Sequence, residues 1–143
     1  MICIDSNILI YAFNESSDFC DSAMEFIEQK AFSEKIAVCD ISLVEFFQVV
    51  TNIKQLETPF SATDAKRVIK SIFENNNFNI LYTNDLIYKA VFDSVDKYSI
   101  KKYGIYDHII AYTCRYHNIK ELYTVNIKDF KKYEFLNVAN PFL

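Results

Sequence analysis

Short apolar runs alternate with longer segments of helical periodicity along the whole of this chain. The runs cover residues 2–5, 36–39, 78–82 and 121–124, with a short fifth candidate at residues 138–139. Runs of this length, bounded by polar residues, indicate buried β-strands. Between them, apolar residues recur three and four positions apart, as in helices, over residues 8–13, 21–32, 42–53, 61–74, 85–98 and 106–117.

This alternation restricts the fold to one class. A helix between two strands requires a crossover connection, and crossover connections make the joined strands parallel. We therefore predict an α/β fold, with a central parallel sheet of four to five strands flanked by helices.

The composition agrees with one compact domain. The chain has 143 residues, 51% of them hydrophobic, which is enough for a full core and argues against disorder. One glycine and two prolines are too few for the many tight turns of an all-β protein. No repeat, linker or low-complexity segment interrupts the sequence. We predict a single domain over residues 1–143.

The cysteines and the lack of a targeting segment indicate the compartment. Cys3, Cys20, Cys39 and Cys114 include no C-x-x-C pair, so the spacing argues against zinc. There is no signal peptide and no apolar run long enough to span a bilayer. We expect buried free thiols, no membrane contact and a cytoplasmic location.

Two acids stand at the ends of distant elements. Asp5 closes the first apolar run, and ligands of open parallel sheets bind beyond the carboxyl ends of the strands. Asp107 opens a helical segment and shares a helix face with Ile110, Ala111 and Cys114, and a buried acid needs a partner or a metal. Either acid could instead cap a helix. The pair suggests a metal site.

Three further residues carry two interpretations each. Ser42 and Glu45 match a capping box, S-x-x-E, but Glu45 also falls beside Gln48 on a helix face that could line a cleft. Asn126 is either a turn residue or a site residue near Asp5, because it follows a strand. Asp129 is either an exposed first-turn acid or a further carboxylate of the site. His108 and His117 are interpreted as structural or surface residues.

Five segments, in order and at these separations, give the chain a family resemblance. It resembles PIN-domain ribonucleases over nearly its whole length, and most closely the VapC-like toxins of bacterial and archaeal toxin–antitoxin pairs. Each segment alone is weakly diagnostic, whereas the ordered set is specific. The segments are Ile4–Phe13, Ile41–Phe46, Ile105–Ala111, Leu122–Phe130 and Val138–Phe142.

The resemblance implies a metal-dependent endoribonuclease, with Asp5, Glu45 and Asp107 binding Mg²⁺ or Mn²⁺. Asn126 stands where many members of the family have an acid, so Asn126, Asp129 or both could help to bind the metal. Packed carboxylates repel one another, and a hard divalent ion relieves the repulsion and activates water for attack on a phosphodiester. The expected catalytic residues are Asp5, Glu45, Asp107, Asn126 and Asp129.

The substrate and partners follow from the same resemblance. A net charge of −4 is unusual for a protein that simply coats nucleic acid, so local lysines must guide an RNA backbone past the acids. Candidates are Lys101, Lys102, Lys128, Lys131 and Lys132, although basic pairs are often only solvated. We expect a homodimer and a small cognate antitoxin, because the helical segments 42–53 and 61–73 carry many large apolar residues; these residues could instead be core.

Two other classes of α/β protein lack residues that they need here, and one alternative to the nuclease remains. A receiver-like domain needs an aspartate after the middle strand, but residues 81–83 are Leu-Tyr-Thr. A haloacid-dehalogenase-type phosphatase needs Asp-x-Asp after the first strand, but Asp5 is followed by Ser6 and Asn7. A non-catalytic PIN-like module that binds RNA or protein through a weakened metal site remains the alternative, because of Asn126.

Overall fold

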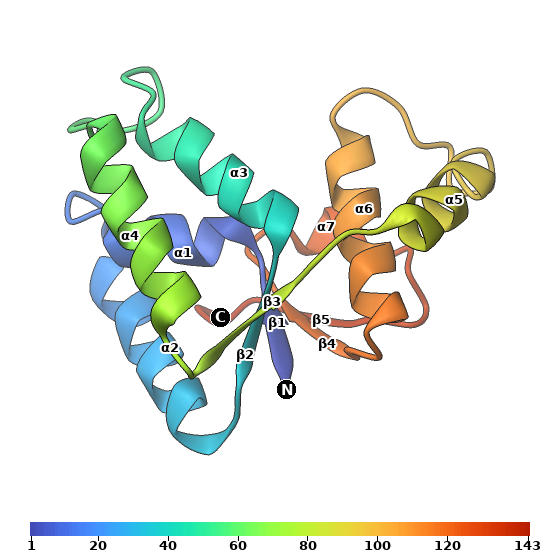
Figure 1. The fold of residues 1–143 in the computed structure, drawn as a ribbon, viewed down its shortest axis with the longest axis horizontal. Coiled ribbons are helices and arrows are strands. Elements are labelled where there is room, and N and C mark those ends of the chain that lie inside the picture. The colour runs from blue at the N-terminus through green and yellow to red at the C-terminus, as the bar shows by residue number, and fades with distance from the viewer.

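The computed structural model describes residues 1–143 and contains one five-stranded parallel sheet (Figure 1). The strand order is β3-β2-β1-β4-β5, so β1 lies at the centre. Each strand pairs in parallel with its neighbours. The strands are β1 (Ile2–Ile4), β2 (Ile36–Cys39), β3 (Phe78–Leu81), β4 (Glu121–Tyr123) and β5 (Asn137–Ala139). The predicted fold class is confirmed.

The helices form two groups, one on each face of the sheet (Figure 1). The first group is α1 (Ser6–Phe13), α2 (Cys20–Ser33), α3 (Asp40–Val50) and α4 (Ala62–Glu74). The second is α5 (Asp85–Asp93) and α6 (Gly104–Tyr116), with the short α7 (Ile127–Phe130) beside α6. No helix combines the length and the hydropathy needed to cross a membrane.

The central strand contributes to both cores because successive side chains of a strand point to opposite faces. Ile2 and Ile4 of β1 pack in the core under α1–α4. Cys3 packs in the core under α5 and α6. Both faces of the sheet are thus buried, which explains why its strands are uniformly apolar in sequence.

Three of the four cysteines lie together in the folded protein, although they are far apart in the sequence. The Sγ atoms of Cys3, Cys39 and Cys114 all lie within 4.8 Å of one another, and all three residues are buried. All four cysteines are free thiols, with Cys20 only partly buried. Thiols packed in this way behave as small apolar side chains of the core.

Several helix boundaries differ from the prediction by two residues or more, and the start of α3 and the end of α5 differ in ways that the hydrogen bonds illustrate. α3 begins at Asp40 rather than residue 42, and the Asp40 carboxylate accepts hydrogen bonds from the main-chain N–H of Ile41 at 2.8 Å and from the main-chain N–H and hydroxyl of Thr83 at 3.0 and 2.7 Å. α5 ends at Asp93 rather than residue 98. The Ser94 hydroxyl donates to the carbonyls of the last turn, and residues 94–99 form turns rather than helix.

Candidate metal and catalytic site

Asp5 caps a helix at the carboxyl end of the central strand, where the candidate site was predicted. It lies directly after β1, is buried, and caps α1 by accepting a hydrogen bond from the main-chain N–H of Ser6 at 2.7 Å. Its second carboxylate oxygen accepts from the Thr124 hydroxyl at 2.7 Å and from the Asn7 amide at 3.2 Å. These donors fix the carboxylate at the carboxyl edge of the sheet. The cap interpretation of Asp5 is confirmed, and its place in a metal site stays a prediction.

Glu45 lies in the middle of α3 and turns one oxygen toward Asp5. Its Oε2 accepts a hydrogen bond from the Ser6 hydroxyl at 3.1 Å. Its Oε1 is buried and has no hydrogen-bond partner within the protein. A buried carboxylate oxygen without a partner is costly unless a cation or a donor from outside the chain satisfies it. Glu45 is thus suited to bind a cation.

The capping-box interpretation of Ser42 and Glu45 is wrong. α3 begins at Asp40, so Ser42 lies inside the helix rather than at its cap. The buried Ser42 hydroxyl has no hydrogen-bond partner, and Glu45 bonds to Ser6 of a different element. The sequence match arose because the true start of the helix lies two residues earlier.

Asp107 lies in the first turn of α6, where Tyr103 and not Asp107 holds the cap position. Burial, together with the negative charges of Asp5, Asp129 and Glu45 and against the opposing charge of Lys132, raises the pKa of Asp107 to about 7. The carboxyl is therefore close enough to the other acids for their charges to matter. In the absence of a cation, it is about half protonated near neutral pH.

The pKa values of Glu45 and Asp5 are also raised. Burial raises the pKa of Glu45, and the charge of Asp5 adds to this effect. Burial also raises the pKa of Asp5, opposed by the hydrogen bonds from Thr124 and Ser6. Three carboxyl groups that disfavour one another's charge form a set of hard oxygen donors, which fits Mg²⁺ or Mn²⁺ better than a soft metal.

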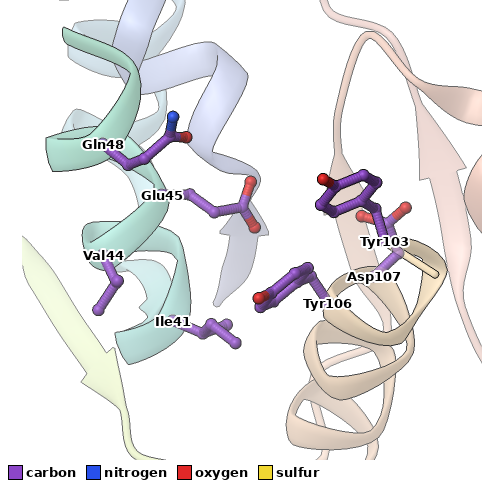
Figure 2. Close-up of a pocket in the computed structure, with 7 residues that line it drawn as sticks. All are labelled: Ile41, Val44, Glu45, Gln48, Tyr103, Tyr106 and Asp107. Atoms are coloured by element: carbon purple, nitrogen blue, oxygen red, sulfur yellow. The ribbon is translucent and has the colours of Figure 1, made fainter. Parts of the chain in front are cut away.

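A pocket of about 480 Å³ opens beside these acids and is called here the α3–α6 pocket. Figure 2 shows Glu45 and Gln48 extending from α3 toward Tyr103, Tyr106 and Asp107 on the α6 side. The residues that line the α3–α6 pocket are Ile41, Val44, Glu45, Gln48, Tyr103, Tyr106 and Asp107. The pocket therefore combines two of the acids with aromatic, aliphatic and amide groups.

The segment after β4 contacts Asp5 through Thr124, a residue that was not predicted from the sequence. Thr124 donates to Asp5, whereas Asn126 is exposed and only its main-chain N–H bonds to the Thr124 hydroxyl, at 3.1 Å. The Asn126 side chain makes no hydrogen bond. Asp129 is also exposed, but its charge acts on Asp107. The charge of Asp129 thus reaches Asp107, whereas the Asn126 amide makes no hydrogen bond to the acids.

Three uncharged residues connect the site: Ser6, Asn7 and Thr124. The Asn7 amide donates to Asp5 and to the Thr124 hydroxyl, at 3.2 and 3.0 Å. The Ser6 hydroxyl joins α1 to Glu45. Ser6 and Asn7 follow Asp5 directly, which was the one available signal, because polar groups beside a buried acid often bond to it.

The five candidate lysines are all exposed, and none forms a salt bridge. Among them, only the charge of Lys132 acts on an acid of the site, where it opposes the rise in the pKa of Asp107. The set is Lys101, Lys102, Lys128, Lys131 and Lys132.

The histidines agree with their structural interpretation. His108 is fully buried, and its ring nitrogens lie 2.8 Å from the Tyr133 hydroxyl, 2.9 Å from the Ser94 hydroxyl and 3.1 Å from the Val91 carbonyl. His117 contacts the Tyr82 carbonyl at 3.2 Å near the surface. Neither ring reaches the carboxylates through a hydrogen bond.

The chain is similar to known proteins in both sequence and structure. The model of the PIN domain family matches residues 2–136. Ribonuclease VapC24 of Mycobacterium tuberculosis is 29% identical over 141 residues, covering 99% of this chain and 97% of the relative.

Two solved structures illustrate the likeness in fold. VapBC2 from Rickettsia felis, bound to a DNA fragment from its promoter, aligns with a TM-score of 0.70 and 23% identity over 98% of both chains. Mycobacterium tuberculosis VapC20, a toxin that cleaves the sarcin–ricin loop, aligns with a TM-score of 0.68 and 10% identity over 85% of this chain and 87% of that one. The resemblance inferred from the five sequence segments is confirmed. Because the family model covers residues 2–136, nearly the whole chain, and the fold is a five-stranded parallel sheet flanked by helices, this protein belongs to the PIN domain family.

Proposed function

We propose that this protein is a divalent-metal-dependent endoribonuclease that hydrolyses RNA phosphodiester bonds and acts as the toxin of a toxin–antitoxin pair. The buried, unpartnered oxygen of Glu45 carries the proposal, because it lies in a site where Asp107 already has its pKa raised to about 7. The full-length similarity to a protein named as a ribonuclease supports the same activity.

The metal would be held by Asp5, Glu45 and Asp107. Mg²⁺ or Mn²⁺ bound to such carboxylates supplies a Lewis acid that activates water and stabilises charge during phosphodiester hydrolysis. The hydrogen bonds from Ser6 and Thr124 hold Asp5 in one orientation, and Ser6 also orients Glu45.

Protons on the acids compete with the ion. Asp107, which is half protonated near pH 7 without a cation, releases its proton when the ion binds. Asp129 would add negative charge to the site and act as its fourth acid, because its charge already raises the pKa of Asp107. Asn126 would contribute only after its exposed side chain reorients, so Asp129 is the stronger candidate.

The five exposed lysines would bind the RNA backbone on either side of the acids: Lys101, Lys102, Lys128, Lys131 and Lys132. None is neutralised by a salt bridge, so each is available to a phosphate. These lysines would let a protein of net negative charge bind RNA. Because they form no salt bridge with the acids, they would not compete with the metal for the carboxylates.

The proposed partners are a small cognate antitoxin and a second copy of the chain, in the cytoplasm. The neighbours in structure include VapBC complexes from several bacteria. An apolar groove of about 370 Å³ lies between α3 and α4, and the exposed Val44, Phe47 and Phe73 line it. An arginine or lysine of the antitoxin would pair with the acids and block the site.

One observation favours a second candidate. Asn126 replaces an acid of the family pattern and is exposed. A PIN domain with a weakened metal site would bind RNA or protein without cleaving it. Cleavage assays separate the two functions directly.

The test is hydrolysis of an end-labelled single-stranded RNA with EDTA, Mg²⁺ or Mn²⁺. The wild type should cleave only with a divalent ion, and Asp5→Asn and Glu45→Gln should each lower the rate by about 10²–10⁴-fold. Glu28→Gln, an exposed glutamate of α2, is the matched control and should cleave like the wild type. Metal-independent cleavage, or full activity in both site variants, would overturn the proposal. RNA binding without cleavage in any ion would favour the non-catalytic module.

A further inference from the structure

We infer that the α3–α6 pocket is a nucleobase-binding subsite in which Tyr103 and Tyr106 stack against one unpaired base of the RNA. This inference rests on the proposed ribonuclease function and adds the class of substrate, a single-stranded segment beside the bond to be cleaved. Four observations on this pocket carry it.

The two tyrosines are exposed where most aromatic rings of this protein are packed. Tyr103 is 84% exposed and Tyr106 is 43% exposed. Neither ring stacks on another aromatic ring, lies under a cation or donates a hydrogen bond from its hydroxyl. Tyr98, Tyr112 and Tyr133, on the same side of the sheet, each contact several other rings. Tyr103 and Tyr106 therefore offer free π-faces beside the acids.

The loop before Tyr103 contains two non-glycine residues with positive φ. Lys102, the residue before it, has φ 54°, and Ser99 in the same loop has φ 52°. These are two of the three non-glycine residues of the chain with positive φ. Such conformations are costly and persist at sites where the chain needs them. Here they bring the exposed ring of Tyr103 to the start of α6, next to Lys101 and Lys102.

The charges of the pocket select a base rather than a phosphate. Glu45 and Asp107 form its acidic part, so a free phosphate would be repelled there. The remaining lining is uncharged, and Ile41 extends toward Tyr106. A neutral aromatic ligand fits this environment, while phosphates farther along the strand can point to the lysines outside. A volume of about 480 Å³ is ample for one base.

Gln48 gives the pocket a group that can bond to a base edge. Figure 2 shows its side chain on the same side as Glu45, extending from α3. Its amide has both donors and an acceptor, and it makes no hydrogen bond within the protein. Stacking on two tyrosines with one amide at the edge is a common way to hold a base of single-stranded RNA.

The base must be unpaired, because a base inside an RNA double helix has both faces covered by the neighbouring bases. The acids beside the pocket would then meet the phosphate attached to the stacked nucleotide. The subsite thus predicts cleavage in loops, bulges or ends of RNA rather than in continuous duplex.

The experiment measures binding without cleavage, by fluorescence anisotropy of a labelled single-stranded RNA in EDTA. Tyr103→Ala and Tyr106→Ala should each weaken binding by about 5- to 100-fold, the range of one stacking contact. Tyr106→Phe should stay within about twofold of the wild type because it keeps the ring. Tyr106→Leu should lose affinity although it keeps apolar bulk, which separates stacking from pocket collapse. A duplex of the same length should bind equally to all variants.

The matched control is Tyr88→Ala, because Tyr88 on α5 is also 43% exposed and lies outside the α3–α6 pocket. It should bind single-stranded RNA like the wild type. Equal affinity in Tyr103→Ala, Tyr106→Ala and Tyr88→Ala would overturn the inference, as would an equal loss for duplex RNA.

A parallel cleavage assay separates the two proposals. Wild-type protein that binds RNA through the tyrosines but never cleaves it would overturn the ribonuclease proposal and support the subsite. Cleavage with no dependence on either tyrosine would overturn the subsite alone. A wild type that binds no RNA would overturn both.

Discussion

At the residue scale, the Thr124 hydroxyl is the contact that joins β4 to the acid at the end of β1. It donates to Asp5 at 2.7 Å and accepts from the Asn7 amide and the Asn126 main chain. These contacts hold one oxygen of Asp5 in place and favour its charged form. A residue that orients a metal-binding carboxylate commonly affects the metal almost as much as the carboxylate itself.

Thr124→Val should therefore weaken Mn²⁺ binding and slow RNA cleavage by about 10–100-fold while keeping the shape of the side chain. Losing the hydrogen bond raises the pKa of Asp5 further, so metal affinity should move to higher pH. Thr124→Ser should restore both properties because it keeps the hydroxyl. The measurement is Mn²⁺ affinity at several pH values; unchanged affinity in Thr124→Val would show that the contact is only structural.

Asp107 gives the metal-free protein a specific dependence of stability on pH. Its pKa is raised from 3.8 to about 7, so the folded state binds its proton more tightly than the unfolded state does. The stability from this group is complete below about pH 4 and is lost as the pH rises through about 7. Asp5 and Glu45 shift in the same direction.

In EDTA, Asp107→Asn should therefore melt at a higher temperature than the wild type at about pH 8, and the two should converge near about pH 4. Mg²⁺ at about pH 8 should raise the melting temperature of the wild type more than that of the variant. Thermal melts followed by circular dichroism check this, with Asp93→Asn at the end of α5 as the control. Parallel curves for wild type and Asp107→Asn would contradict the crowding of the three acids.

The individual acids could be chosen from the sequence because each follows or opens an apolar pattern. Asp5 ends a strand and Asp107 interrupts an apolar helix face, and both features are local. Thr124 could not be chosen in this way. Its role depends on β4 pairing beside β1, which brings Tyr123 opposite Ile4 although they are far apart in sequence.

At the scale of elements, a buried network joins α6 to the segment that follows α7. Nε2 of His108 lies 3.1 Å from the Val91 carbonyl, which can only accept, so Nε2 carries the proton. Nδ1 therefore accepts the hydrogen bond from the Tyr133 hydroxyl at 2.8 Å. The network holds α5, α6 and the segment carrying Asp129 and Lys132 in one arrangement beside the acids.

Tyr133→Phe should destabilise the fold by about 1–3 kcal/mol, because it leaves the buried Nδ1 of His108 without a donor. Tyr116→Phe is the control, since Tyr116 is exposed and its hydroxyl makes no hydrogen bond. Urea denaturation gives both free energies of unfolding. A loss no larger than that of the control would mean that the His108–Tyr133 hydrogen bond contributes little.

The elements themselves were largely predictable, and their ends were not. Apolar periodicity located the five strands and the long helices, because burial of one face creates that pattern. Helix ends depend on contacts across the fold. The carboxylate of Asp40 bonds to Thr83 at the observed start of α3, a tertiary contact absent from local sequence, and the earlier start made the Ser42–Glu45 match misleading.

At the scale of the whole molecule, the strand order determines which distant residues meet. β1 lies between β2 and β4, so Asp5, α3 and Thr124 converge at one edge of the sheet. The same order gathers the thiols of Cys3, Cys39 and Cys114 within 4.8 Å, a proximity that no spacing rule indicates. The sequence predicted that the strands are parallel, but it did not predict their order in the sheet.

The proposed dimer belongs to this scale. The exposed Val44, Phe47 and Phe73 surround an apolar groove that a partner would cover. Light scattering should give the mass of a dimer of the 16.8 kDa chain, and Phe47→Asp should shift it toward the monomer. A wild-type monomer at all micromolar concentrations would contradict the proposed homodimer.

The central claim is that Asp5, Glu45 and Asp107 bind one divalent ion as a group, and calorimetric titration with Mn²⁺ tests it most directly. The wild type should bind at a saturable site, and Asp5→Asn, Glu45→Gln and Asp107→Asn should each weaken binding by about tenfold or more. Asp93→Asn, outside the site, should bind like the wild type. Mn²⁺ affinity that is the same in the wild type and in all three site variants would contradict the claim.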